Sequence, residues 1–271
     1  MRLLSCSLQT RCQRCLAQGQ FKDEKMTVTD MTTIAPPEIR RVMHALKRRD
    51  LIVVDVGRVT PHMIRITLQD ESLRDFPSVS PDDHIKIFVP QADGEMARRD
   101  YTPRVFDRAA GTLVLDFVDH DGGPAADWAR NAKPGDRLAI GGPKGSRVIT
   151  GDIRNWLLIG DETALPAIGR RVEELAAGTP VTTLAAVTDA AEEQHFETQA
   201  SHTPVWVHRP VEQAHQAEPF LHALKTIQIV PQTFIWVAAE ASVARAIRNV
   251  LENERGISPQ WIKASGYWTK S

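Results

Sequence analysis

Short apolar runs, separated by turns rich in proline and glycine, dominate the first half of the chain. The run at 51–56 is followed by one at 63–68, where apolar and polar residues alternate as they do in a half-buried strand. Further short runs occupy 85–89, 113–118 and 137–140. Many short strands at this spacing predict a small antiparallel barrel over residues 47–150, interrupted by one helix at 124–132.

The pattern changes after Gly151, where apolar strands begin to alternate with helical stretches. A strand of the buried type at 156–160 precedes a helix at about 164–176. Further strands are expected at 181–187, 205–207 and 234–238, and a second helix at 241–254. This alternation predicts a parallel sheet with helices on both faces over residues 151–271. Such a sheet binds its ligands at the carboxyl ends of the strands.

Composition excludes several classes of protein. A chain of 271 residues, 42% of them hydrophobic, is long enough to bury a full core and to form two domains. The formal net charge of −1 gives no electrostatic case for nucleic acid as a partner. No apolar run approaches the ~20 residues that a membrane span needs. We therefore expect a soluble, cytoplasmic protein with no membrane span and no nucleic-acid partner.

All three cysteines, Cys6, Cys12 and Cys15, fall at the start of the chain. This distribution fits a reducing compartment, where a chain of this size needs no disulfides. A metal site at Cys12 and Cys15 would usually need four ligands, and the sequence has no fourth cysteine, so we expect no metal site. Residues 1–46 are expected to be an extension that is disordered at its start, or to include sequence upstream of a true start at Met26 or Met31.

The segment RDYTPR at 99–104 fits the binding of a planar redox ring with a charged tail. The phenol of Tyr101 can lie flat on a heteroaromatic ring, and the fork of Arg99 suits a phosphate. The hydroxyl of Thr102 can hydrogen-bond the edge of the ring. The alternative interpretation is an ordinary polar loop after a strand.

A second candidate site is the segment DFVDHDGGPAADW at 116–128. A strand there runs into two glycines and then Pro124, which suits the first turn of a helix and leaves the N–H groups of Ala125 and Ala126 free. A phosphate is the natural ligand of such a helix start. The alternative is a plain connection from strand to helix, in which His120 is a simple surface residue.

Two weaker signals lie in the second half. GDETALPA at 160–167 occupies the first turn from strand to helix, although it lacks the usual G-x-G-x-x-G pattern and carries two acids. The turn at 236–241 is the corresponding later turn. Near the C-terminus, Tyr267 and Trp268 either close over a bound ring or fill the core, and core filling is the expected role of Trp261.

Together these segments resemble the siderophore-interacting protein family, the NAD(P)H-dependent ferric-siderophore reductases with a ferredoxin-reductase-like fold. The resemblance runs from about residue 48 to the end of the chain. It rests on seven motifs in order: DDHIK (82–86), RDYTPR (99–104), DFVDHDGGPAADW (116–128), PGD (134–136), GGPKGS (141–146), GDETALPA (160–167) and K-x-S-G-Y-W (263–268).

The resemblance implies an FAD-binding antiparallel β-barrel at 47–150 and an NAD(P)H-binding α/β domain at 151–271. It places Arg99 at the FAD phosphate, Tyr101 on the ring face and Thr102 at the reactive edge, with Thr163 as a further catalytic group. Ala126 stands where relatives often carry a hydroxyl residue, and Ala239 replaces a common glycine. The other cofactor-binding residues that it implies are Asp100, Asp116, Phe117, Val118, His120, Gly123, Pro124, Ala125, Ala126, Asp161, Glu162 and Ala164.

The implied reaction passes electrons from NADPH or NADH through FAD to Fe(III) held by a siderophore. Acids after the strand at 181–187 disfavour the 2′-phosphate of NADPH, whereas Arg170 and Arg171 favour it, so the choice of nicotinamide stays open. Because ferric catecholates are anionic, we expect Lys86, Lys144 and Lys263 to bind the substrate; the alternative is three solvated lysines.

Two other functions remain. The same flavoprotein reaction fits another electron acceptor, such as a ferredoxin, free flavin or a quinone. A protein of a different class, which binds a siderophore without turnover, would contain no flavin that NAD(P)H reduces.

Overall fold

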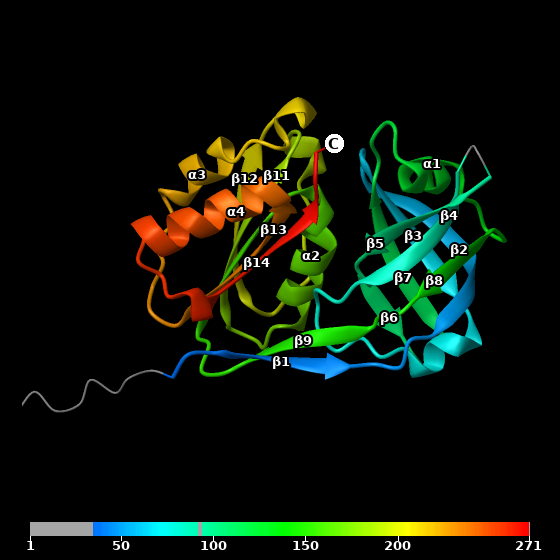
Figure 1. The fold of residues 1–271 in the computed structure, drawn as a ribbon, viewed down its shortest axis with the longest axis horizontal. Coiled ribbons are helices and arrows are strands. Elements are labelled where there is room, and N and C mark those ends of the chain that lie inside the picture. Colours follow the sequence, from blue (N-terminus) through cyan, green and yellow to red (C-terminus); the bar gives the residue numbers. More distant parts are fainter. Residues whose placement is uncertain (1–34, 92–93, 271) are drawn as a thin grey trace, which may run out of the picture. The chain divides into compact units, whose positions relative to one another are not determined.

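A computed structural model describes residues 35–91 and 94–270, which belong to one compact unit, Ile34–Ser271. Figure 1 shows an antiparallel sheet from the first half of the chain and a parallel sheet with helices from the second half. We refer to residues 48–141 as the antiparallel lobe and to residues 155–268 as the parallel lobe. Cys6, Cys12 and Cys15 lie outside the described residues.

The antiparallel lobe is a seven-stranded sheet in the order β5-β4-β8-β2-β3-β7-β6. The alternation expected at 63–68 is confirmed, because Ile64, Ile66 and Leu68 are buried while Arg65 and Thr67 between them are half-exposed. The helix expected at 124–132 is also present and packs into the same core through Ala125 and Ala129. The elements are β2 (Arg48–Thr60), β3 (Met63–Gln69), β4 (Ile85–Pro90), β5 (Met96–Tyr101), β6 (Val105–Asp107), β7 (Thr112–Val118), α1 (Pro124–Asn131) and β8 (Arg137–Gly141).

A separate two-stranded ribbon joins the start of the described chain to the end of the antiparallel lobe. In it β1 (Glu38–Met43) pairs antiparallel with β9 (Gly145–Thr150). Gly145 allows the close pairing, since a Cβ there would lie 2.7 Å from the Val42 carbonyl oxygen. The part of the predicted extension that the structure describes therefore contains a paired strand.

The parallel lobe has the strand order β12-β11-β10-β13-β14, and all four pairings are parallel. Alternate residues of β10 enter two cores: Leu158 packs with α2 on one face, and Leu157 and Ile159 pack with α3 and α4 on the other (Figure 1). The predicted parallel sheet with helices on both faces is confirmed. Its elements are β10 (Asn155–Gly160), α2 (Leu165–Glu174), β11 (Pro180–Val187), β12 (Ser201–His208), α3 (Glu218–Leu224), β13 (Thr233–Glu240), α4 (Ala241–Asn249) and β14 (Ile262–Trp268).

The helix ends differ from the expectation in ways that concern the site. The first helix of the parallel lobe begins with a separate 3₁₀ turn, Glu162–Ala164, because the Asp161 carboxylate caps that turn. The last helix changes to a π turn at Val250–Glu254. Four other 3₁₀ turns occupy Glu71–Asp75, Ala190–Glu192, Val211–Gln213 and Pro259–Trp261.

Two features are absent from the described residues: a membrane-spanning helix and a metal-binding cluster. No helix within 35–91 and 94–270 is long and apolar enough to cross a membrane. The same part of the chain contains no group of three or more His, Cys, Asp or Glu side chains arranged to hold a metal ion.

Candidate functional site

Tyr101 ends strand β5 as part of an aromatic stack. Its ring centroid lies 4.4 Å from that of Phe117, and Phe117 lies 5.7 Å from Trp128 of α1. Burial raises the pKa of the Tyr101 phenol, which therefore stays neutral at physiological pH. The first three residues of RDYTPR thus end a paired strand and the last three follow it, and β4 fixes the position of Tyr101 through its pairing with Ile85.

Thr102 lies where the two lobes meet. Its side chain is buried and lies beside the hydroxyl of Tyr267 on β14. The Tyr267 ring packs edge-on against Trp236, with centroids 6.0 Å apart. Burial, followed by the charge of Asp82, raises the pKa of Tyr267 well above its ordinary value. The structure therefore brings together two motifs that are far apart in sequence.

Arg99 and Asp100 differ in their partners. Arg99 is exposed on β5, and its Nη1 donates to the Arg98 carbonyl oxygen at 3.0 Å. Asp100 forms an exposed ion pair with Lys86 on the neighbouring strand β4. The guanidinium of Arg99 is accessible to a phosphate, whereas the Asp100 carboxylate neutralises a lysine.

The start of α1 has the features of a phosphate-binding turn. Gly123 is the N-cap, Pro124 follows it, and no side chain caps the helix. A Cβ on Gly123 would lie 2.6 Å from His120 Cε1, so the glycine lets the His120 ring lie against the turn. Ala125 and Ala126 present their backbone at this end while their side chains are buried. These features fit the diphosphate of a dinucleotide.

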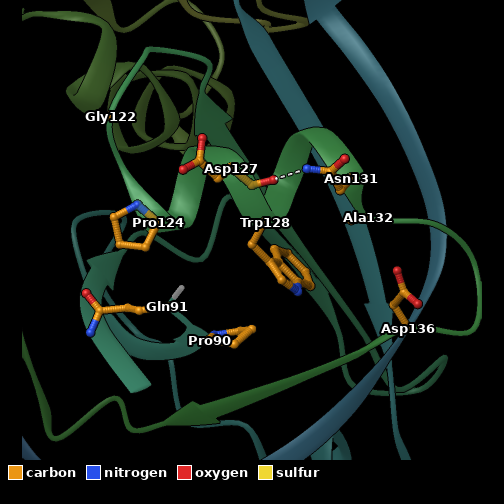
Figure 2. A pocket seen from close by; sticks show the side chains of 9 residues that line it. All are labelled: Pro90, Gln91, Gly122, Pro124, Asp127, Trp128, Asn131, Ala132 and Asp136. Atoms are coloured by element: carbon orange, nitrogen blue, oxygen red, sulfur yellow. Dashed lines mark hydrogen bonds between the residues drawn. The ribbon is translucent and has the colours of Figure 1, made fainter. Parts of the chain in front are cut away.

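A cavity of about 510 Å³ adjoins this turn. Figure 2 shows its wall, where Trp128 is the largest side chain and Asn131 donates a 2.7 Å hydrogen bond to the Asp127 carbonyl oxygen. Gly122 and Pro124 belong to the lining, so the cavity is continuous with the start of α1. The full lining is Pro90, Gln91, Gly122, Pro124, Asp127, Trp128, Asn131, Ala132 and Asp136.

Three of the expected cofactor-binding residues lie behind this surface. Asp116 is buried and accepts two 2.7 Å hydrogen bonds from Arg65, at Nε and Nη2. Phe117 is fully buried beneath Tyr101, and Val118 packs against the core between the parallel sheet and α2. Their side chains support the site from inside.

At the carboxyl end of β10, Asp161 is fully buried and every hydrogen bond that it accepts comes from the chain itself. Oδ1 accepts from the backbone N–H and hydroxyl of Thr163. Oδ2 accepts from the Glu240 N–H at 3.0 Å and the Trp268 indole N–H at 2.8 Å. Asp161 therefore holds Thr163 and the C-terminal strand in place.

Glu162 and Ala164 complete this turn. The guanidinium of Arg209 donates two hydrogen bonds to Glu162, at 2.7 and 3.1 Å. Burial raises the pKa of Glu162 more than the charge of Arg209 lowers it. Ala164 is fully buried, and a Cβ on Gly160 would lie only 2.5 Å from the Ala164 Cβ. The two small residues let the strand and the following turn approach closely.

The three candidate substrate lysines differ in exposure. Lys86 is partly exposed beside Asp100, and Lys144 is exposed after β8. Lys263 is only 7% exposed and forms an ion pair with Asp82, whose carboxylate also accepts from the Trp236 indole N–H at 3.0 Å. Burial raises the pKa of Asp82, but the charge and hydrogen bond of Lys263 outweigh it and leave that pKa below its ordinary value.

Asp82 is a residue of the site that sequence reasoning missed. It was visible only as the first letter of the DDHIK motif, with no pattern that linked it to Lys263. The partners are 181 residues apart in sequence, so the contact arises only when the two lobes come together.

Arg170 and Arg171, which the sequence offers as partners for a 2′-phosphate, both have other partners within the described structure. Arg170 Nη1 donates to Ser78 Oγ at 2.8 Å and its Nε donates to Glu174, so the guanidinium is held between the lobes. The Arg171 guanidinium lies 4.7 Å from the centre of the Trp156 ring, and burial lowers its pKa. Both side chains are already bound within the protein.

These two lobes define the class of the protein by its fold, which is ferredoxin-reductase-like. The ferredoxin reductase of carbazole 1,9a-dioxygenase shares the fold at a TM-score of 0.63 and 19% identity, covering 83% of this chain and 70% of that one. The model of the siderophore-interacting FAD-binding domain matches residues 52–98 and 92–147, and that of the siderophore-interacting protein matches 153–271. The chain belongs to the siderophore-interacting protein family.

Individual relatives agree with this assignment. The NADPH-dependent ferric-chelate reductase of Escherichia coli is 33% identical over 84% of this chain and 96% of its own length. The ferric vibriobactin reductase ViuB of Vibrio cholerae is 29% identical over 78% of this chain and 86% of its own length. The crystal structure of a siderophore utilization protein from T. fusca has a TM-score of 0.79 and 35% identity, covering 87% of this chain and 97% of that one.

Proposed function

We propose that this protein is an FAD-dependent NAD(P)H reductase that passes electrons to siderophore-bound Fe(III) and releases Fe(II). The observation that carries the proposal is the pair of hydrogen bonds from Arg104 to Glu173, which joins the RDYTPR motif to helix α2 of the parallel lobe. In our assignment residues 47–150 hold FAD and residues 151–271 hold the nicotinamide. The reaction belongs in the cytoplasm, where NADPH is available.

Within this proposal the antiparallel lobe supplies the flavin contacts. Tyr101 lies against the ring, Thr102 hydrogen-bonds its edge, and Arg99 pairs with a phosphate. The uncapped start of α1, from Gly123 to Ala126, binds the diphosphate through its backbone N–H groups. The adjoining cavity has room for the remainder of the dinucleotide.

Bound FAD would accept an electron pair as hydride and deliver electrons singly, so one NAD(P)H reduces two ferric complexes. Asp161 keeps Thr163 at the carboxyl edge of β10, where a parallel sheet receives its ligand. Siderophores hold iron through hard oxygen ligands, which suit Fe(III) better than Fe(II), so reduction releases the metal. We propose NADPH as the donor, by analogy with the Escherichia coli relative.

The anionic substrate would be attracted by lysines near the flavin. Lys86 and Lys144 are the accessible candidates, although Lys86 has Asp100 as a competitor. Lys263 can reach an anion only if its ion pair with Asp82 opens. The substrate roles of all three lysines remain predictions.

An anaerobic titration tests the proposed function. We expect the purified protein to show an oxidised-flavin spectrum, to bleach on addition of NADPH, and to recolour when a ferric siderophore is added together with a colorimetric Fe(II) chelator. Two equivalents of Fe(II) should appear per NADPH. Absence of bleaching would indicate a protein that binds the siderophore without turnover. Bleaching followed by recolouring only with a ferredoxin, free flavin or a quinone would identify another acceptor.

A further inference from the structure

A buried carboxylate connects the two lobes away from the flavin motifs. Glu192, in the 3₁₀ turn after β11, is only 5% exposed. Its Oε2 accepts from the Thr60 hydroxyl at 2.6 Å, and its Oε1 accepts from the His62 N–H at 3.0 Å and lies 2.8 Å from His62 Nδ1. Thr60 and His62 form the turn between β2 and β3 of the antiparallel lobe.

The neighbouring glutamate shows that this contact is specific. Glu193 is exposed and pairs with His208 at the end of β12, within its own lobe. Two consecutive carboxylates with histidine partners therefore do different things, and only Glu192 crosses between lobes. A buried carboxylate is tolerated only when it is well hydrogen-bonded, so the contact strongly favours one arrangement of the two surfaces.

The same hairpin turn also contacts the proposed phosphate-binding segment. The Asp119 N–H donates to the His62 carbonyl oxygen at 2.8 Å. The Asp119 carboxylate pairs with Arg58 of β2 at 2.8 Å and with Arg130 of α1 at 2.7 Å. A continuous set of hydrogen bonds thus runs from Glu192 through His62 to the residue before His120.

We propose that Glu192 is a positioning residue: it fixes the nicotinamide-binding lobe on the β2–β3 hairpin and so aligns the hydride donor with the flavin. The inference rests on the proposed function. Hydride transfer requires reacting atoms ~3–3.5 Å apart, and a displacement of about 1 Å reduces the rate on the order of a hundredfold. The other polar contacts between the lobes, at Arg104, Arg170 and Asp82, lie on other segments, and at this hairpin Met63 adds an apolar contact with the core of the parallel lobe.

The test compares Glu192→Ala with Glu193→Ala in the full-length holoprotein. Stopped-flow mixing with saturating NADPH, and separately NADH, gives the limiting rate constant of flavin reduction. We expect Glu192→Ala to lower it by about tenfold or more with both nicotinamides. Glu193→Ala removes the same charge from the same turn but keeps the contact between lobes, so its limiting rate constant should match the wild type. Glu192→Gln, which keeps one acceptor oxygen, should give an intermediate value.

Hydrogen exchange of the apoprotein supplies a readout independent of turnover. The amides of Thr60, His62 and Asp119 should exchange faster in Glu192→Ala than in either the wild type or Glu193→Ala. Thr60→Val removes one hydrogen bond and leaves the carboxylate in place, so it tests the same role if the alanine variant misfolds. We expect Thr60→Val to slow flavin reduction severalfold. Reoxidation of flavin already reduced by dithionite should be unchanged in all variants.

The outcomes separate this role from the proposed function. Faster exchange with an unchanged limiting rate constant would overturn the positioning role and leave the contact purely structural. Equal losses in reduction, reoxidation and flavin content would also overturn it, because they indicate a general effect on folding. A wild-type flavin that neither nicotinamide bleaches would overturn the proposed function itself.

Discussion

Tyr101 shows how a single side chain is prepared for a ring ligand. Its phenol is kept neutral by burial, and its ring is held from behind by Phe117, so little conformational entropy remains to be lost when a second ring stacks on it. The adjacent Thr102 is anchored by Tyr267. The position of both groups is settled before any cofactor binds.

Removal of the Tyr101 ring should therefore weaken flavin binding without unfolding the chain. We expect Tyr101→Ala to raise the Kd for FAD about tenfold, which corresponds to ~1.4 kcal/mol. Tyr101→Phe keeps the ring and should bind FAD like the wild type. Fluorescence titration of the apoprotein measures both values, and an alanine variant with wild-type affinity would rule out stacking at this position.

The pair Asp82–Lys263 is the clearest residue-scale stability determinant. Both side chains are less than a tenth exposed, so Asp82→Asn would leave the Lys263 ammonium buried without a counter-ion. We expect a loss of about 3–5 kcal/mol in the free energy of unfolding, most of it recovered in Asp82→Asn combined with Lys263→Met. Urea unfolding at pH 7 provides the comparison. Equal stability of the single variant and the wild type would contradict it.

The same pair predicts a pH dependence. Because the folded pKa of Asp82 lies below its ordinary value, the pair contributes stability above the unfolded-state pKa of ~3.9. That contribution is lost as the pH falls from there through the folded pKa. Urea midpoints measured between pH 6 and 3 should fall more steeply for the wild type than for the double variant. Parallel profiles would show that another carboxylate controls acid unfolding.

At the scale of elements, the start of α1 is the segment whose sequence and geometry agree most closely. Pro124 begins the helix as expected, and the absence of a Cβ on Gly123 lets the His120 ring lie close to the turn. Strand β5 illustrates the opposite case. Only one of its six residues, Ala97, is buried, so no alternation of apolar residues reveals it, and pairing with β4 makes it a strand.

Gly123→Ala tests the phosphate-binding turn. The new methyl group would displace the His120 ring, which is exposed and free to swing away, so thermal stability should hardly change. The methyl would then stand beside the N–H groups that meet the phosphate, and we expect the Kd for FAD to rise about tenfold. Gly57→Ala, with no heavy atom within 4 Å of the added Cβ, is the matched control. Equal FAD affinity in the two variants would show that the turn does not bind the FAD phosphate.

At the scale of the whole molecule, contacts between the lobes are polar and specific. Arg104, which ends the RDYTPR motif, is 4% exposed and donates a pair of hydrogen bonds to Glu173 of α2. Gly169 on the same helix leaves room for it, since a Cβ there would lie 3.0 Å from Arg104 Nη2. The flavin-binding motif thus continues directly into the surface that holds the second lobe.

Breaking this contact should uncouple the unfolding of the two lobes. We expect the wild-type holoprotein to unfold in one calorimetric transition. Arg104→Met removes both charged hydrogen bonds, about 2 kcal/mol in total, and should split the transition in two. A variant that still unfolds in a single, shifted transition would mean that the remaining contacts suffice.

The sequence by itself determined the two kinds of sheet and the start of α1, and it supplied the motifs that we propose to bind the flavin, because periodicity, turn residues and short motifs are local properties. Only the tertiary structure decided which partner each charged group meets: Asp82 for Lys263, Arg209 for Glu162, and the Thr60 hydroxyl, 132 residues earlier in the chain, for Glu192. Burial is the physical reason. A lysine or an arginine reads as a free cation in the sequence, and it becomes a partner in a fixed ion pair when folding removes both charges from water.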